Sequence, residues 1–338
     1  MFLLKCINSK IIRLNIFLLF FVISLIIINN CSDDKNIKQI SSDYNCDDFN
    51  DPEIWDTRYR IAKTSYLEGS YEDALEVYNN ILIDAYNTAN KLKIILTKEN
   101  IGLLYIKMGK YQFAEKTFNE IEFELHKMKK QGRPNIKYLA TNYENIGRLQ
   151  KKLKKYSDST RSFETALNIY IKCKQLNRVI ICLNHIGANY FHEGKYDESL
   201  NYFVKAAYVD RTNSYKISLS LSYFYLGKIY ILKKDYKKAK YYLHNALRLD
   251  RERKSTDNIF QDLKLIAEIY VLEDNWLKAQ NYYSLCYEVL KNIDKKKLWV
   301  DDQIINVLNN LINLYKKTKD EKSFKYYQDE LDKFRISK

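Results

Sequence analysis

A repeat of about 40 residues is the sequence feature that most constrains how this chain folds. Segments of similar pattern begin at Asn100, Asn184 and Tyr225: NIGLLYIKMGKYQFAEKTFNEI, NHIGANYFHEGKYDESLNYFVKA and YLGKIYILKKDYKKAKYYLHNA. A fixed period of about 20 to 50 residues is typical of chains built from stacked, similar units. We therefore expect each repeat to form one structural unit, a pair of helices joined by a turn.

Four positions recur in register within these repeats. The first helix carries a small residue: Ala62, Gly102, Gly147, Gly187, Gly227 and Ala267. The turn carries an aromatic residue: Tyr71, Tyr111, Tyr156, Tyr196, Tyr236 and Trp276. The second helix carries a small residue and then a bulky one: Ala74 and Tyr78, Ala114 and Phe118, Ser159 and Phe163, Ser199 and Phe203, Ala239 and Leu243, Ala279 and Tyr283. Because small residues let helices approach and bulky ones fill the groove between them, stacking buries both faces of each pair.

Composition supports helices with short connections. The chain has only 8 Gly and 2 Pro among 338 residues, whereas turn-rich β architectures need more of both. A hydrophobic content of 46% excludes wholesale disorder. The chain is therefore expected to be all-α.

The recurring positions resemble those of the tetratricopeptide repeat (TPR) family. The resemblance implies a right-handed α-solenoid of about seven stacked helix-turn-helix repeats, with helices longer than in the usual unit of about 34 residues. We place the solenoid at residues 52–338, with repeats at about 55–92, 95–132, 140–176, 180–216, 220–256 and 260–296, and a degenerate capping repeat at 304–337.

The N-terminal 30 residues have the pattern of a signal peptide. Three basic residues, Lys5, Lys10 and Arg13, precede an apolar run from Ile16 to Ile28. This run is shorter than the roughly 20 residues that a transmembrane helix needs. We therefore expect residues 1–30 to direct export, and a permanent membrane span is the weaker interpretation.

Cys31 directly follows the apolar run, and the stretch from Ile28 to Asp34 resembles a bacterial lipoprotein signal. The resemblance implies lipid attachment at Cys31, with residues 31–51 forming a flexible acidic tether. The expected location is then the periplasmic or surface side of a bacterial outer membrane. An uncleaved anchor and an ordinary secretory signal, which would release a secreted protein, remain open alternatives.

The formal net charge is +14 and falls to +11 when Lys5, Lys10 and Arg13 are removed with the signal. The remaining Lys and Arg alternate with Asp and Glu, and no basic stripe with interleaved stacking aromatics stands apart from the repeats. We therefore expect a protein or peptide ligand and no nucleic acid.

No catalytic or metal-binding motif stands out. The chain lacks a nucleophile elbow and a phosphate-binding glycine loop, and His185 and His192 lie two helical turns apart. We therefore expect no enzymatic activity, no cofactor and no metal. Buried thiols are the expected state of the solenoid cysteines, with a Cys173–Cys182 bridge as the alternative.

The family resemblance also implies a ligand groove lined by first helices. Asparagine or basic side chains hold the ligand there, and the matching positions in this chain are Lys63, Asn100, Asn145, Arg148, Asn184, His185 and Lys228. An asparagine amide can donate to and accept from an extended peptide backbone. The alternative is that these are merely solvated helix positions.

Together these observations predict a non-enzymatic protein–protein interaction scaffold, tethered to a membrane by an N-terminal lipid and binding a protein or extended peptide in its concave groove. The alternative is a sensory or regulatory TPR protein that acts through a separate signalling partner. The sequence does not determine the oligomeric state.

Overall fold

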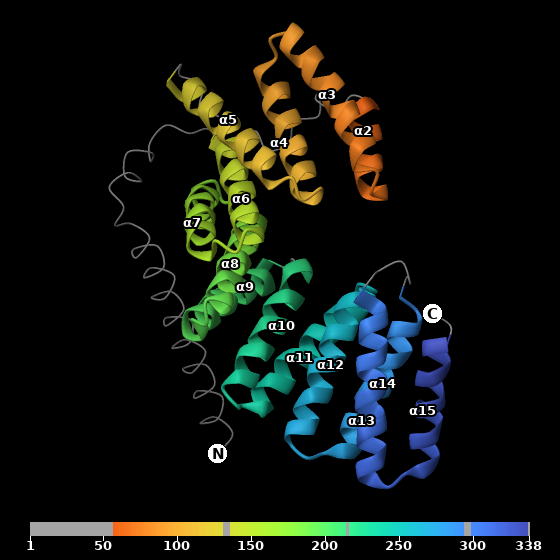
Figure 1. Ribbon diagram of the computed structural model, residues 1–338. Coiled ribbons are helices and arrows are strands. Elements are labelled where there is room, and N and C mark those ends of the chain that lie inside the picture. Colours follow the sequence, from red (N-terminus) through yellow and green to blue (C-terminus); the bar gives the residue numbers. More distant parts are fainter. Residues whose placement is uncertain (1–56, 131–135, 214–215, 294–298, 337–338) are drawn as a thin grey trace, which may run out of the picture. The chain divides into compact units, whose positions relative to one another are not determined.

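The computed structural model describes residues 57–130, 136–213, 216–293 and 299–336, and every regular element within them is an α-helix (Figure 1). In chain order the helices are α2 (Thr57–Glu68), α3 (Tyr71–Asn87), α4 (Lys91–Lys107), α5 (Tyr111–Lys130), α6 (Ile136–Lys152), α7 (Tyr156–Lys172), α8 (Leu176–His192), α9 (Tyr196–Asn213), α10 (Lys216–Leu232), α11 (Tyr236–Glu252), α12 (Thr256–Leu272), α13 (Trp276–Lys291), α14 (Trp299–Thr318) and α15 (Glu321–Ile336). The expected all-α class is confirmed. The predicted signal and tether, including Cys31, lie outside the described residues.

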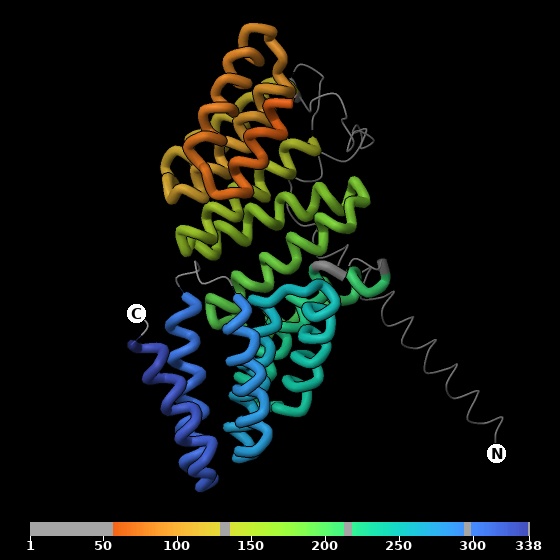
Figure 2. The backbone as a smooth tube through the Cα atoms, turned by 90° about the vertical axis from the view of Figure 1, so that its right-hand side faces the viewer, coloured from red at the N-terminus to blue at the C-terminus, as the bar shows by residue number. Residues whose placement is uncertain are grey.

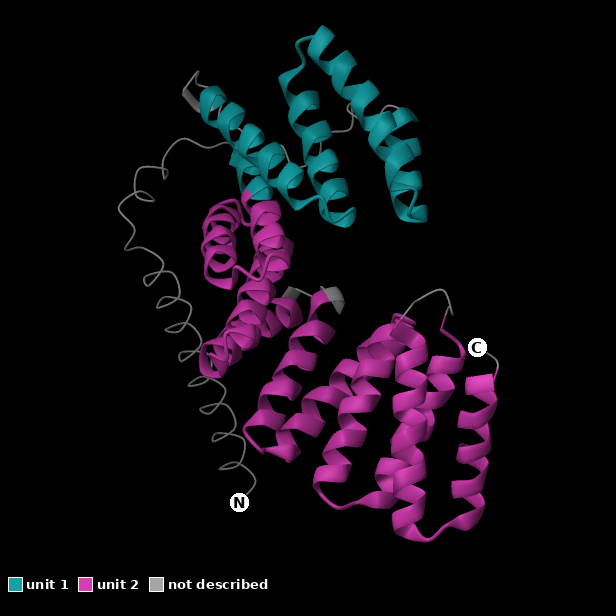
Figure 3. Cartoon of the chain, in the orientation of Figure 1, with its two compact units in different colours: residues 1–142 teal, residues 143–338 magenta. Residues whose placement is uncertain are grey.

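The described residues divide into two compact units, one up to Asn142 and one from Tyr143 onward (Figure 3). In the first unit, α2 to α5 pack in chain order, each on the next. In the second, α7 to α15 do the same, and α10 also contacts α8 and α12. Figure 2 shows α10 to α15 lying side by side. This sequential packing of helix pairs is a TPR-type α-solenoid of about seven repeats, as the sequence predicts.

The recurring turn aromatics are the first residues of the second helices, from Tyr71 of α3 to Trp276 of α13. A residue in the left-handed region ends each preceding helix, for example Gly109 with φ 73° and Lys154 with φ 59°. The following amide then reaches back across the last turn, as Lys110 N does to Tyr105 O at 2.8 Å. This geometry closes the helix end and lets the chain reverse within two or three residues.

The small and bulky positions face one another within each pair. A Cβ added to Gly102 would lie 2.5 Å from the Phe118 ring, and one added to Gly147 would lie 2.8 Å from the Phe163 ring. Both phenylalanines are fully buried. The two helices of a pair can therefore approach this closely only because the first carries no side chain at the crossing point.

Serine replaces alanine at the second small position in two repeats, and there it adds a hydrogen bond. Ser159 Oγ donates to the carbonyl of Gly147 at 2.7 Å, and Ser199 Oγ donates to that of Gly187 at 2.8 Å. These bonds join α6 to α7 and α8 to α9 where the helices are closest.

The final helix has the composition of an array end. On α15 only Leu331 is fully buried, while Phe324 and Tyr327 pack partly against the core. Lys322, Lys325, Asp329, Asp332 and Lys333 are exposed and Gln328 is half-buried. The polar outer face can therefore meet solvent in place of a further repeat.

Candidate functional site

Positive side chains of the first helices α6 and α10 lie near an aromatic ring and a histidine of α8 in the second unit. We use the term cationic surface for Arg148 and Lys151 of α6, Phe191 and His192 of α8, and Tyr225 and Lys228 of α10. Burial lowers the pKa of His192, and so do the nearby charges of Lys151 and Lys228. The side chains from the three helices therefore lie within electrostatic reach of one another.

Lys151 is the least compensated charge on this surface. Burial, together with the charge of Lys152, lowers the pKa of Lys151 to about 8. No carboxylate is paired with it among the residues that the structure describes. An ammonium that has lost water without gaining a counterion is held at a free-energy cost, and the lowered pKa expresses that cost.

Lys228 is surrounded by aromatic rings. Its Nζ lies 4.6 Å from the ring centroid of Phe191, 5.5 Å from that of Tyr225 and 5.7 Å from that of Phe224. Cation–π contacts of this kind hold an ammonium in place without neutralising it. Burial lowers the pKa of Lys228, and the nearby charge of Glu268 opposes this shift.

The two histidines stack on rings and carry little charge. His185 lies 4.5 Å from the Phe163 ring, nearly parallel to it, and His192 lies 5.1 Å from the Tyr156 ring. Burial lowers the pKa of His185 to about 3, and the charges of Lys151 and Arg148 add to the effect. His185 is therefore a neutral hydrogen-bonding group at physiological pH.

A buried carboxylate fixes the geometry on one side of the surface. Glu144 of α6 is 1% exposed and is ion-paired with Arg148 one turn along the helix. It also accepts a hydrogen bond from the Tyr170 hydroxyl of α7 at 3.0 Å and lies 3.4 Å from Arg178 Nη1 of α8. Because Glu144 offsets the charge of Arg148, the uncompensated charge of the surface rests on Lys151 and Lys228.

Two asparagines predicted to line the groove are buried between helices. Asn145 and Asn184 are each almost fully buried. Asn184 Oδ1 accepts a hydrogen bond from Ser222 Oγ of α10 at 2.7 Å, which joins the first helices of consecutive pairs. Asn184 therefore fixes the spacing of the helices that carry the cationic surface.

The remaining predicted groove residues differ in their surroundings. Arg148, His185 and Lys228 lie on neighbouring first helices, whereas Lys63 of α2 and Asn100 of α4 belong to the other unit. Lys63 is exposed. Asn100 Nδ2 donates to the carbonyl of Leu96 in its own helix at 2.8 Å.

The sequence did not predict four members of the surface, which are Lys151, Phe191, His192 and Tyr225. Lys151 and Phe191 both lie four residues after the small residue of their helix, one turn beyond it on the same face. Comparing that position between repeats would have found them. The burial of these two side chains and the lack of a counterion at Lys151 depend on neighbouring repeats, and the sequence carries no signal for either.

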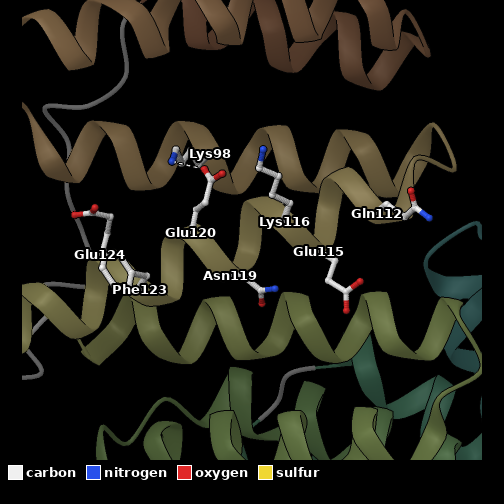
Figure 4. A pocket seen from close by; sticks show the side chains of 8 residues that line it. All are labelled: Lys98, Gln112, Glu115, Lys116, Asn119, Glu120, Phe123 and Glu124. Carbon is white, nitrogen blue, oxygen red and sulfur yellow. Dashed lines mark hydrogen bonds and ion pairs between the residues drawn. The ribbon is translucent and has the colours of Figure 1, made fainter.

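A second feature is an open hollow of about 570 Å³ in the first unit (Figure 4). One face of α5 forms most of it, and α4 contributes Lys98, which is ion-paired with Glu120 at 2.6 Å. The lining residues are Lys98, Gln112, Glu115, Lys116, Asn119, Glu120, Phe123 and Glu124. Acidic and basic side chains are mixed here, so the hollow has no consistent charge to select a ligand.

Within the described parts of the chain, no group of three or more His, Cys, Asp or Glu side chains is placed to hold a metal ion. The side chains of Cys173, Cys182 and Cys286 are buried, and none of the three is in a disulfide. Burial raises the pKa of Cys182 and therefore suppresses the reactive thiolate. Among the residues that the structure describes, no helix is long and apolar enough to span a bilayer.

Comparisons with known proteins agree with this architecture. A tetratricopeptide repeat family model matches residues 178–252. The chain is similar, with a TM-score of 0.68 and 14% identity, to a STAND (signal transduction ATPase with numerous domains) protein with a tetratricopeptide repeat sensor from Pyrococcus horikoshii. The match covers 83% of this chain and 42% of that one, so the chain spans less than half the length of that protein.

Two further solved structures are similar. One is the apo form of the quorum sensor NprR from B. thuringiensis, with a TM-score of 0.58, 18% identity, and coverage of 83% of this chain and 81% of that one. The other is the C-terminal part of a TPR repeat-containing protein from Cytophaga hutchinsonii, with a TM-score of 0.50, 16% identity, and coverage of 83% and 96%. At such identities the likeness shows the fold alone. No curated protein matches the sequence significantly.

Proposed function

This chain is a tetratricopeptide-repeat protein, and we propose that it is a non-enzymatic scaffold that binds a protein or an extended peptide across its first helices. The observation that carries the proposal is the cationic surface, where Lys151 and Lys228 are held partly buried without an ion-pair partner in the described chain. Groups held at such a cost are commonly found at binding sites.

The arrangement of the surface favours an extended ligand. The side chains of the surface come from α6, α8 and α10, each one repeat further along the array. Packed helices lie about 8 to 10 Å apart, and an extended chain advances about 3.3 Å per residue. An extended segment running along the array therefore presents about three residues to each repeat.

We further propose that the scaffold is exported and tethered by a lipid on Cys31, at the periplasmic or surface side of a bacterial outer membrane. The support is the sequence alone, in which a basic flank, an apolar run and Cys31 follow in order. Metabolic labelling with palmitate tests the tether. We expect label in the wild type and none in Cys31→Ala, and an unlabelled wild type would remove the lipid while leaving the scaffold intact.

Site-specific photocrosslinking tests the scaffold. A photoreactive benzoylphenylalanine is placed at Phe191 of the cationic surface or, as control, at Tyr241 of the second helix α11, which is 62% exposed. In cell envelopes we expect a discrete crosslinked species from position 191 and none of the same mass from position 241. Identical patterns from both positions would contradict binding at the first helices.

A sensory or regulatory role is the second candidate. Its support is the likeness to the sensor-bearing STAND protein and to the quorum sensor. A sensor requires a ligand that changes how the solenoid engages a separate signalling partner. Crosslinking from position 191 is compared with and without the sensed ligand. A scaffold gives the same crosslinked partner in both states, whereas a sensor gives a different pattern when its ligand is present.

A further inference from the structure

The chain usually supplies partners for half-buried lysines, and the cationic surface departs from this pattern. Lys240 is paired with Glu273 at 2.6 Å, and Lys98 is paired with Glu120 at 2.6 Å. By contrast, no described carboxylate is ion-paired with Lys151, and Lys228 has the charge of Glu268 nearby but no ion pair with it. The two lysines without an ion pair therefore lie on α6 and α10, with α8 between them in the chain.

The groups around Lys151 reinforce its positive field. Arg148 and Lys152 on its own helix are positively charged, whereas His185 and His192, which face it from α8, are largely neutral and supply no negative charge. Glu144, the buried acid on α6, already holds Arg148, Tyr170 and Arg178. An anionic group of a ligand placed here would stabilise the charged forms of Lys151 and Lys228.

The aromatic rings argue against a nucleic acid as this anion. Tyr225 is stacked on Phe203 at 4.6 Å, and Phe191 lies against Lys228. Single-stranded nucleic acids bind by stacking bases on free ring faces, and those faces are already covered here. A short carboxylate side chain needs no free ring face, since its methylene groups can rest on the ring edges.

We propose that the segment bound by the cationic surface is acidic, with side-chain carboxylates placed beside Lys151 and Lys228. This inference rests on the proposed scaffold function and names the class of its ligand, an extended peptide region rich in Asp or Glu. Internal carboxylates suffice, because the two lysines lie on two different helices, α6 and α10, and both lie near His192 of α8.

Peptide binding to the full-length protein in detergent tests the proposal. The probe is a fluorescent 12-residue peptide with an amidated C-terminus in which Asp alternates with Ser and Gly, and its partner probe has Asn in place of Asp. We expect the Asp peptide to bind and the Asn peptide to bind at least about tenfold more weakly, as the loss of charge-assisted contacts implies. Equal binding of the two peptides would overturn the proposal.

Matched lysine variants separate this site from the general attraction of a chain with net charge +14. Lys151→Gln and Lys228→Gln each remove one charge from the surface, and Lys237→Gln removes one from the exposed face of α11. We expect the first two to weaken binding about tenfold or more and the third by less than about twofold. Equal effects from all three would show nonspecific attraction only and overturn the proposal.

The pH dependence gives a readout that a purely structural role would not move. Since the pKa of Lys151 in the free protein is lowered to about 8, Lys151 must take up a proton to bind the anion above that pH. Wild-type affinity for the Asp peptide is therefore expected to fall above pH 8, and that of Lys151→Gln to change less. Thermal unfolding of each variant verifies that it folds, which is needed for Lys228→Gln because that change removes the cation–π contacts of Lys228.

Failure of this inference is distinguishable from failure of the proposed function. If position 191 crosslinks a discrete partner but the Asp peptide does not bind, the scaffold stands and the acidic ligand is wrong. If neither is observed, both are wrong. Equal competition of the Asp peptide by inorganic phosphate at the same charge concentration would show a site for any anion and also overturn the acidic-peptide assignment.

Discussion

At the residue scale, the size of one side chain decides how closely two helices approach. The Cβ that alanine would add at Gly147 lies 2.8 Å from the Phe163 ring, whereas the one at Gly187 lies 3.1 Å from the Phe203 ring. The first distance forces a buried ring to move, and the second requires a shift of only a few tenths of an ångström. The two equivalent glycines therefore differ in how well they tolerate replacement by alanine.

Gly147→Ala is expected to lower the free energy of unfolding by about 1 to 3 kcal/mol through overpacking. Gly187→Ala is expected to cost less, because the gain in helix propensity of about 1 kcal/mol offsets a smaller clash. Chemical denaturation of both variants measures the difference. The double variant Gly147→Ala with Phe163→Leu should recover part of the loss, and no recovery would show that the ring is not the cause.

A single buried acid also makes the stability of the fold depend on pH. Asp262 of α12 is fully buried, and neither of its carboxylate oxygens has a hydrogen-bond partner in the described chain. Burial, with the charge of Asp250 nearby, raises the pKa of Asp262 to about 8. Asp250 itself lies near Arg253 and accepts hydrogen bonds from Ser220 and Asn258.

Between the unfolded pKa of about 4 and the folded pKa near 8, the folded chain binds one proton more at Asp262 than the unfolded chain. Stability is therefore expected to fall as pH rises through this window, with a slope of up to about 1.4 kcal/mol per pH unit from this group. Asp262→Asn removes the slope. Urea denaturation at pH 5, 6, 7 and 8 tests this, and parallel stability profiles for wild type and variant would contradict it.

At the element scale, polar contacts between helices locate the repeats relative to one another. Glu144 contacts Tyr170 of α7 and Arg178 of α8, and Asn184 of α8 contacts Ser222 of α10. Apolar stacking alone is non-directional, whereas these contacts are made in one register only. The positions of the basic residues on α6, α8 and α10 depend on them.

Glu144→Gln is expected to weaken the joint between α6, α7 and α8. The two arginines around Glu144 are 36% and 38% exposed and can be partly hydrated, so we expect a cost of about 1 to 3 kcal/mol. Amide hydrogen exchange should accelerate in these three helices and stay unchanged in α12 and α13. A uniform acceleration in all of them would contradict a local role.

At the scale of the whole molecule, stability comes from each pair of helices covering the next. The core cluster of the second unit extends from α11 through α12, α13 and α14 to Leu331 of α15, and includes Tyr283, Tyr287 and Leu290 of α13. No central core compensates when one end is removed. Loss of a terminal pair therefore exposes the apolar face of the pair before it.

Truncation after Asn292, which removes α14 and α15, is expected to expose these α13 side chains, raise the binding of a hydrophobic dye and promote aggregation. Truncation after Thr318 removes α15 alone and should do so less, because Leu331 is the only fully buried residue of that helix. Dye fluorescence and light scattering measure both. Equal behaviour of the two truncations would show that α14 covers nothing.

The sequence alone determined the all-helical class, the stride of the array and the places where helices cross, from the small residue at Gly147 to the bulky one at Phe163. These features follow from spacing along the chain, because helical periodicity puts residues of fixed separation on one face. The sequence also identified Arg148, His185 and Lys228, which lie on neighbouring helices in the structure.

Only the tertiary structure decided which charges have partners. The pairing of Glu144 with Arg178, the lack of a counterion at Lys151 and the burial of Asp262 depend on groups that lie on other helices. The sequence places a lysine on a face, but the water it loses and the carboxylates it meets depend on how the repeats stack. Electrostatic energy varies with these distances and with local burial, and a linear pattern specifies neither.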